Sequence, residues 1–162
     1  MNLGAFGEAE EAIRMTDYET LRCEVKWAAQ WGKFYIADIL WLLGRHEEAI
    51  TTAVDAGARA AEPPTPGLAG TYSRWSVLVA CREGACERQL RRLEKLRENR
   101  ERLDTLDRAE LDCALVLLTG KLGIRAEVYE KAARNAVAEL PVACTQQLRS
   151  FGLLVDTALS LA

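Results

Sequence analysis

Few residues of this chain have the type and spacing that catalysis or metal binding requires. The 162 residues include one histidine, His46, and five cysteines without a Cys-x-x-Cys pair: Cys23, Cys81, Cys86, Cys113 and Cys144. A lone histidine forms neither a catalytic triad nor a metal site, and an odd set of scattered cysteines is not a disulfide or zinc framework. No glycine-rich Lys-Ser/Thr motif for phosphate occurs. We therefore expect no enzymatic activity, no catalytic residue, no metal site and no cofactor.

The cysteines have the pattern of small buried hydrophobic residues in a reducing compartment. A redox pair of Cys81 and Cys86 is the alternative, although an offset of five residues fits one helix face poorly. The first residues, 1–7, lack the basic and apolar regions of a secretory signal, and no apolar run reaches the length of a membrane span. We expect a cytoplasmic protein that does not bind a membrane.

One constellation combines aromatic side chains with a carboxylate. Its members recur at steps of four, three, four and three residues, which places them on one stripe of a helix: Trp27, Trp31, Phe34, Asp38 and Trp41. Such rings stack on a peptide or a small polyol, and Asp38 would direct it. The same spacing is typical of a helix core or a dimer contact, because aromatic area mostly serves packing. Both interpretations stay open from the residues alone.

A charged stretch from 82 to 108 holds nine basic and seven acidic residues. Opposite charges four residues apart predict a solvated helix face: Glu87 and Arg91, Arg97 and Glu101, Glu98 and Arg102. Near-balanced charge gives little counterion release, and the whole chain has a net charge of −3. We expect no direct binding of nucleic acid.

The elements that position these residues are all expected to be helices. No alternating strand pattern or hairpin signal occurs. Thr16 with Glu19, and Asp107 with Glu110, have the spacing of capping boxes. Helical periodicity and end signals predict an all-α chain of about eight helices, at 7–15, 17–43, 46–61, 66–82, 85–103, 107–120, 124–139 and from 141 onward.

Four glycines, each followed by a related segment, divide the chain at regular intervals. Gly7-Glu-Ala-Glu-Glu-Ala-Ile13 recurs as Gly44-Arg-His-Glu-Glu-Ala-Ile50, and weaker echoes follow Gly84 and Gly123. The separations are 37, 40 and 39 residues. A period of this length, carried by helices, is typical of stacked antiparallel helical hairpins. We expect a single repeat domain over 1–162 with turns near these four glycines.

The segment Leu42-Leu-Gly-Arg-His-Glu-Glu-Ala-Ile50 resembles the inter-helix turn and second-helix start of a tetratricopeptide repeat, and 3–13 resembles it too. The resemblance implies that Ala49 lets two helices cross closely. Three other small residues lie at positions where the family usually has one: Ala37, Ala53 and Ala56. In the segments after Gly84 and Gly123, Gln89 and Val128 stand where the family has a small residue. The repeat period also exceeds the usual ~34 residues. Longer repeats of this kind resemble the superhelix of MalT-type regulators, the large ATP-binding LuxR-family transcription activators.

The resemblance implies an α-α superhelix whose first helices line a groove. Matching Gly44 to the family's turn glycine puts four residues on that groove face: Trp31, Phe34, Asp38 and Trp41. The implied function is a non-catalytic protein–protein interaction or regulatory scaffold within a bacterial signalling or transcription regulator. The alternatives are a sensor of a small sugar or peptide ligand in the same groove, and a homodimerisation module.

The ends of the chain carry one further expectation. In this register the chain begins on the second helix of a hairpin and ends on a first helix, and 153–162 is largely apolar. A solenoid end normally needs a polar cap. We expect a piece of a longer array, or ends covered by another copy, so the partners are another protein or peptide and a second copy. An ordinary core helix folded back on the domain is the alternative.

Overall fold

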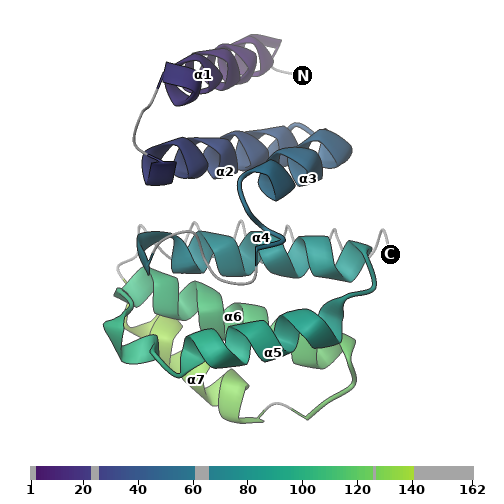
Figure 1. Ribbon diagram of the computed structural model, residues 1–162, viewed down its shortest axis with the longest axis vertical. Helices are drawn as coiled ribbons and strands as arrows, with labels where there is room; N and C mark the ends of the chain where they lie inside the picture. Colours follow the sequence, from purple (N-terminus) through teal and green to yellow (C-terminus); the bar gives the residue numbers. More distant parts are fainter. Residues whose placement is uncertain (1–2, 23–25, 61–65, 126, 141–162) are drawn as a thin grey trace. The chain divides into compact units, whose positions relative to one another are not determined.

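The computed structural model describes residues 3–22, 26–60, 66–125 and 127–140, and every regular element in these ranges is a helix (Figure 1). The all-α prediction is confirmed. In the described residues no helix is both long and apolar enough to cross a membrane. The helix predicted from 141 lies outside them. The elements are α1 (Leu3–Arg22), α2 (Lys26–Leu42), α3 (His46–Asp55), a 3-10 turn η1 (Pro66–Leu68), α4 (Ala69–Arg82), α5 (Cys86–Arg97), a 3-10 turn η2 (Arg100–Arg102), α6 (Thr105–Lys121) and α7 (Glu127–Ala138).

The N-terminal helices differ from the prediction. α1 continues through Thr16, so the predicted break there is wrong, and the helix expected over 17–43 is divided between α1 and α2. Gly7 lies inside α1 and does not have a positive φ, so no turn forms at that glycine. A threonine in a helix interior costs only a few tenths of a kcal/mol (about 0.7 at most), and the surrounding Glu, Ala and Leu residues favour helix.

The chain divides into two compact units, 1–58 and 59–162. In the first unit α2 packs against both α1 and α3. In the second unit α6 is the central helix, because it packs against α4, α5 and α7. Each unit therefore contains helices adjacent in sequence that also lie side by side (Figure 1). The stacking of all hairpins into one superhelix stays a prediction.

The other three glycines do end helices, as predicted. Gly44, Gly84 and Gly123 have φ values of 78°, 68° and 67°. After α2, the backbone N–H of Arg45 donates to the carbonyl oxygen of Leu40 at 2.9 Å, which closes the helix end around the left-handed residue. A side chain is strained in this conformation, so glycine is the favoured residue. Local sequence therefore determines where these helices end.

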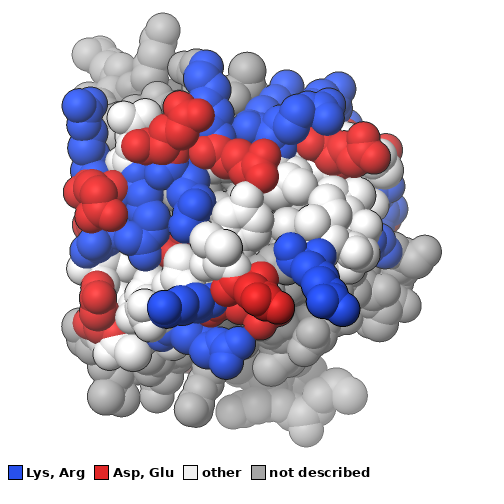
Figure 2. All heavy atoms as spheres, turned by 90° about the horizontal axis from the view of Figure 1, so that it is seen from below, with Lys and Arg blue, Asp and Glu red and all other residues white. Residues whose placement is uncertain are grey.

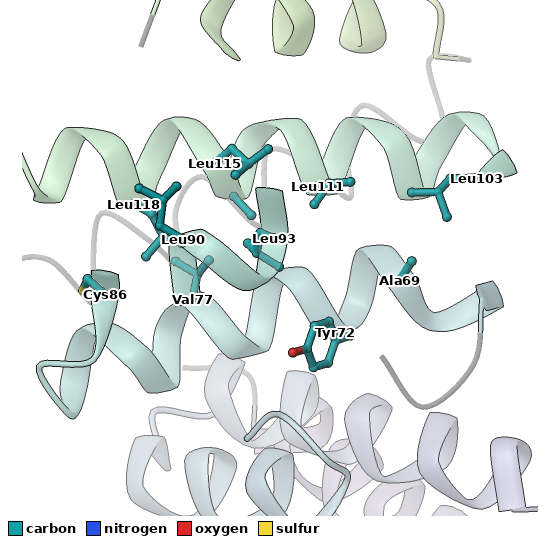
Figure 3. Packing of buried hydrophobic residues seen from close by; sticks show 11 residues of the cluster. Ala69, Tyr72, Val77, Cys86, Leu90, Leu93, Leu103, Leu111, Leu115 and Leu118 are labelled. Atoms are coloured by element: carbon teal, nitrogen blue, oxygen red, sulfur yellow. The ribbon is translucent and has the colours of Figure 1, made fainter. Parts of the chain in front are cut away.

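A cluster of buried apolar residues in the second unit comes mainly from α4, α5 and α6 (Figure 3). Leucines of α6 point toward α5 and α4, where they meet Leu90, Leu93 and Val77. Burial of apolar surface, at about 25 cal/mol per Å², makes this cluster stabilise the unit. Its buried members are Ala69, Tyr72, Val77, Cys86, Leu90, Leu93, Leu103, Leu111, Ala114, Leu115 and Leu118.

The positions at which a tetratricopeptide repeat would carry a small residue differ in residue type and burial. Alanines at the expected positions of the first unit are fully buried: Ala37, Ala49, Ala53 and Ala56. Gln89, which replaces such an alanine, is also buried, and its Nε2 donates to Ser76 Oγ at 2.8 Å. Val128, the other replacement, is 67% exposed. The glutamine is tolerated because its amide finds a partner on α4.

Candidate functional site

α2 carries all five residues of the predicted stripe, but the stripe does not form one surface. Phe34 and Trp41 are 0% and 6% exposed, whereas Trp31 is 52% exposed. Asp38 is half-buried. Trp27 lies in α2, and its side chain is outside the described part of the chain. The predicted groove residues therefore divide into a buried set and an exposed set.

Three exposed residues of α2, together with the half-buried Asp38, define a different stripe, which we call the aromatic face: Trp31, Tyr35, Asp38 and Leu42. Its members are four, three and four residues apart, so they lie on one side of the helix. The rings of Trp31 and Tyr35 stack with centroids 5.7 Å apart and planes within 7°. Tyr35 is 46% and Leu42 is 71% exposed. Tyr35 and Leu42 are not among the site residues predicted from the sequence, although both lie at helical spacing from Trp31.

The buried part of the stripe contributes to the packing of the hairpin. The indole of Trp41 lies 4.4 Å, centroid to centroid, from the imidazole of His46, the first residue of α3. His46 is half-buried. The one histidine of the chain is thus a packing partner of Trp41, on the helix that α2 packs against.

The two units differ in charge. By sequence, residues 1–58 hold ten acidic and five basic side chains, a net charge of −5. Residues 59–162 hold fourteen acidic and sixteen basic side chains, a net charge of +2. The aromatic face therefore belongs to the acidic unit.

A second group of polar residues lies inside the second unit. Asp112 is fully buried and accepts hydrogen bonds from Arg100 at 2.7 and 2.9 Å, with Arg97 Nε 3.7 Å from its other oxygen. Arg74 of α4 lies 3.6 Å from Glu110 of α6 in a similarly buried pair. These buried charges are paired across helices, which is how a folded interior tolerates them.

The predicted capping box of Asp107 and Glu110 is wrong. Asp104 precedes α6, and its Oδ1 accepts from the Asp107 N–H at 2.8 Å, so Asp104 is the cap. With that position filled, the Asp107 carboxylate instead accepts from the Gly70 N–H at 2.9 Å. Glu110 pairs with Arg74. Tertiary contacts thus use both acidic residues that the local pattern assigned to the helix end.

The charged stretch from 82 to 108 is partly surface and partly structural. Arg88, Arg91 and Arg102 are exposed, as the predicted solvated face requires. Arg97 and Arg100 instead reach Asp112. Figure 2 shows one face of the molecule, on which basic and acidic side chains are interspersed.

A surface hollow of about 570 Å³ lies among α5, the end of α6 and α7. Tyr129 donates to Glu94 at 2.6 Å on its wall, and the Arg97 guanidinium lies 5.1 Å from the centre of the Tyr129 ring. Two charged groups of this wall, Glu94 and Arg97, therefore both contact Tyr129. Among the described residues, no group of three or more His, Cys, Asp or Glu side chains is placed to hold a metal ion.

No protein-family model, curated protein or solved structure matches this chain. Within the part of the chain that the structure describes, the aromatic face brings three large exposed side chains to one helix: Trp31, Tyr35 and Leu42.

Proposed function

We propose that the chain is a non-catalytic protein–protein interaction module, and that the aromatic face of α2 binds a basic segment of another protein that also carries apolar side chains. The observation that carries this proposal is the exposed stack of Trp31 on Tyr35. Tyrosine and tryptophan are enriched at interfaces, because their rigid rings supply much contact area at a small loss of side-chain entropy.

The clustering of these side chains matters more than the exposure of any one of them. Single hydrophobic residues on a surface are common and need no special cause. Here Trp31, Tyr35 and Leu42 are all about half or more exposed and share one side of a helix. An aromatic side chain buries about 150–250 Å² when it is fully covered. Truncation of such a residue at the centre of an interface typically lowers the binding free energy by about 2 kcal/mol or more.

Charge decides the class of partner. The unit that carries the aromatic face has a net charge of −5, and Asp38 lies within the face. Complementary charge speeds encounter and disfavours acidic competitors. A segment with lysine or arginine beside leucine or aromatic residues meets both requirements.

The resemblance to tetratricopeptide repeats supports the same kind of role, since the first helix of each hairpin lines the binding groove in that family. α2 has this position relative to Gly44. A place within a bacterial signalling or transcription regulator rests on that resemblance.

The experiment is selection from a random peptide library displayed on phage, with the full chain as the target. We expect the selected peptides to combine basic with aliphatic or aromatic residues. Binding should fall at least about tenfold when Trp31→Ala and Tyr35→Ala are combined, as for the loss of an interface anchor. The matched control combines Ile124→Ala and Val128→Ala, which truncates two similarly exposed residues (49% and 67%).

The outcome also separates the alternatives. Selected peptides without basic residues, or equal loss of binding in the control, would contradict the proposal. If the Trp31 and Tyr35 variant instead sediments as a smaller species than the unmodified chain, the face joins two copies. If a sugar, rather than a peptide, stabilises the unmodified chain but not the variant, the module is a small-ligand sensor.

A further inference from the structure

Two cysteine thiols meet across the turn between α4 and α5. Cys81 lies in the last turn of α4 and Cys86 is the first residue of α5. Their Sγ atoms are 3.6 Å apart. Cys86 is 7% exposed and Cys81 is half-buried. An offset of five residues separates two side chains on a continuous helix, but here the chain reverses at Gly84 between them.

The backbone around the pair is already held in place. The N–H of Ala85 donates to the carbonyl oxygen of Ala80 at 2.8 Å, which closes the turn. A disulfide bond is about 2.05 Å long, so the two sulfur atoms must approach by about 1.5 Å. Rotation of the two side chains is a small change compared with moving a helix, and the short separation makes the pair suitable for intramolecular oxidation.

Cys86 is one of the residues that line a surface hollow of about 500 Å³. Arg88 and Arg91 line it together with Glu87, and both arginines are exposed. Glu83, on the same rim, is hydrogen-bonded by Arg59 at 2.8 Å. Guanidinium groups recognise carboxylates through paired hydrogen bonds. Arg88 and Arg91 are therefore the groups of this hollow that can bind the carboxylates of a small molecule.

We propose that Cys81 and Cys86 form a reversible dithiol–disulfide site that reacts with low-molecular-weight disulfides bearing carboxylates, of the glutathione disulfide type. First, the Cys86 thiolate attacks one sulfur of the small disulfide, whose S–S bond breaks and releases one small thiol. Then the Cys81 thiolate attacks Cys86 Sγ and releases the second. Two protein thiols are oxidised, one small disulfide is reduced, and the two protein thiol protons end on the two small thiols.

The order of attack follows from position. Cys86 lines the hollow and is the first residue of α5, whereas Cys81 is not among the residues that line it. Burial, and then the neighbouring Cys86, raise the pKa of the Cys81 thiol to about 12. Once Cys86 is joined to the small molecule its negative charge is gone, which removes one obstacle to ionisation of Cys81.

Trypsin makes the test direct, because it cleaves after Arg82 and so separates the two cysteines. Peptide 75–82 contains Cys81, and peptide 83–88 contains Cys86. The reduced full chain is treated with glutathione disulfide, the remaining thiols are alkylated, and the digest is analysed by mass spectrometry. We expect the two peptides to be recovered as one disulfide-linked pair that dithiothreitol separates. Persistent separate adducts on the two peptides overturn the proposal.

Two sets of variants act as controls. Cys81→Ser should stop the reaction at an adduct on Cys86, and Cys113, which is also half-buried, should react more slowly than the pair in the unmodified chain. Arg88→Ala combined with Arg91→Ala should slow the reaction with glutathione disulfide about threefold or more, and leave the rate with neutral hydroxyethyl disulfide unchanged. Equal slowing with both reagents, or oxidation of Cys113 as fast as the pair, overturns the proposal. Circular dichroism confirms that each variant is folded.

Discussion

Asp107 Oδ1 accepts a hydrogen bond from the backbone N–H of Gly70 at 2.9 Å, which joins the first turn of α6 to the first turn of α4. A Cβ atom built on Gly70 would lie 2.7 Å from that oxygen and 2.9 Å from the Cα of Asp107. Real Cβ atoms are not found this close to backbone. The two helices approach each other at this point because residue 70 has no side chain.

Substitution of Gly70 by alanine tests this close approach. We expect Gly70→Ala to lower the free energy of unfolding by about 1–3 kcal/mol, since the backbone of Asp107 cannot turn away as a flexible side chain could. Gly120→Ala is the control, because Gly120 lies in α6, is exposed and has no such neighbour within 4 Å. It should raise stability by up to about 1 kcal/mol through helix propensity. Urea denaturation of both variants checks the prediction, and equal effects would contradict it.

The same contact predicts a dependence on pH. Burial raises the pKa of Asp107 from 3.8 to about 6, against the opposing effect of the Gly70 hydrogen bond. The folded chain therefore binds this proton more tightly than the unfolded chain does. The stabilisation by the bound proton is complete below pH 3.8 and is lost as the pH rises through about 6.

Asp107→Asn removes the ionisation and keeps an oxygen that can accept from Gly70. Relative to this variant, the unmodified chain should lose stability between about pH 4 and pH 7. The measurement is the free energy of unfolding of both proteins at several pH values in this range. A constant difference across the range would show that Asp107 does not titrate as its burial requires.

Asp112 provides a test of the buried ion pairs. It is fully buried, and its hydrogen bonds from Arg100 raise the pKa of that guanidinium, against the opposing effect of burial. Asp112→Ala leaves Arg100 partly buried without its carboxylate, so we expect a loss of about 3–5 kcal/mol of unfolding free energy. Glu130→Ala breaks an exposed pair with Arg134 four residues away and should change stability by less than about 0.5 kcal/mol. Similar losses in thermal or urea denaturation would contradict this assignment.

Local signals in the sequence were sufficient for the helix ends at Gly44, Gly84 and Gly123, because a left-handed residue after a helix is a property of a few neighbouring residues. They were not sufficient at Thr16, where a capping pattern competes with strong helix formers on both sides. Asp107 shows a second limit of prediction from local sequence. Its partner, Gly70, is 37 residues away in the sequence, so no local pattern could show that this side chain is used between helices.

The aromatic face of α2 shows a third limit of prediction from sequence. Periodicity places aromatic residues on α2 but permits two neighbouring stripes, one through Phe34 and Trp41 and one through Tyr35 and Leu42. Both contain Trp31. The helices packed on α2 determine which stripe is covered, and that information is tertiary. The buried Gln89 is similar, because its partner Ser76 lies on another helix.

The different burial of Trp41 and Trp31 gives the last prediction. Trp41 is 6% exposed and packs on His46, whereas Trp31 is 52% exposed. Trp41→Ala should therefore lower the free energy of unfolding by about 3–5 kcal/mol, as truncation of a large core residue does. Trp31→Ala should lower it by less than about 1 kcal/mol, because 52% of Trp31 is already exposed to solvent in the folded chain. Urea denaturation followed by far-ultraviolet circular dichroism measures both. Should Trp31→Ala destabilise the chain as much as Trp41→Ala, the aromatic face would be part of the core and could not serve as a docking surface.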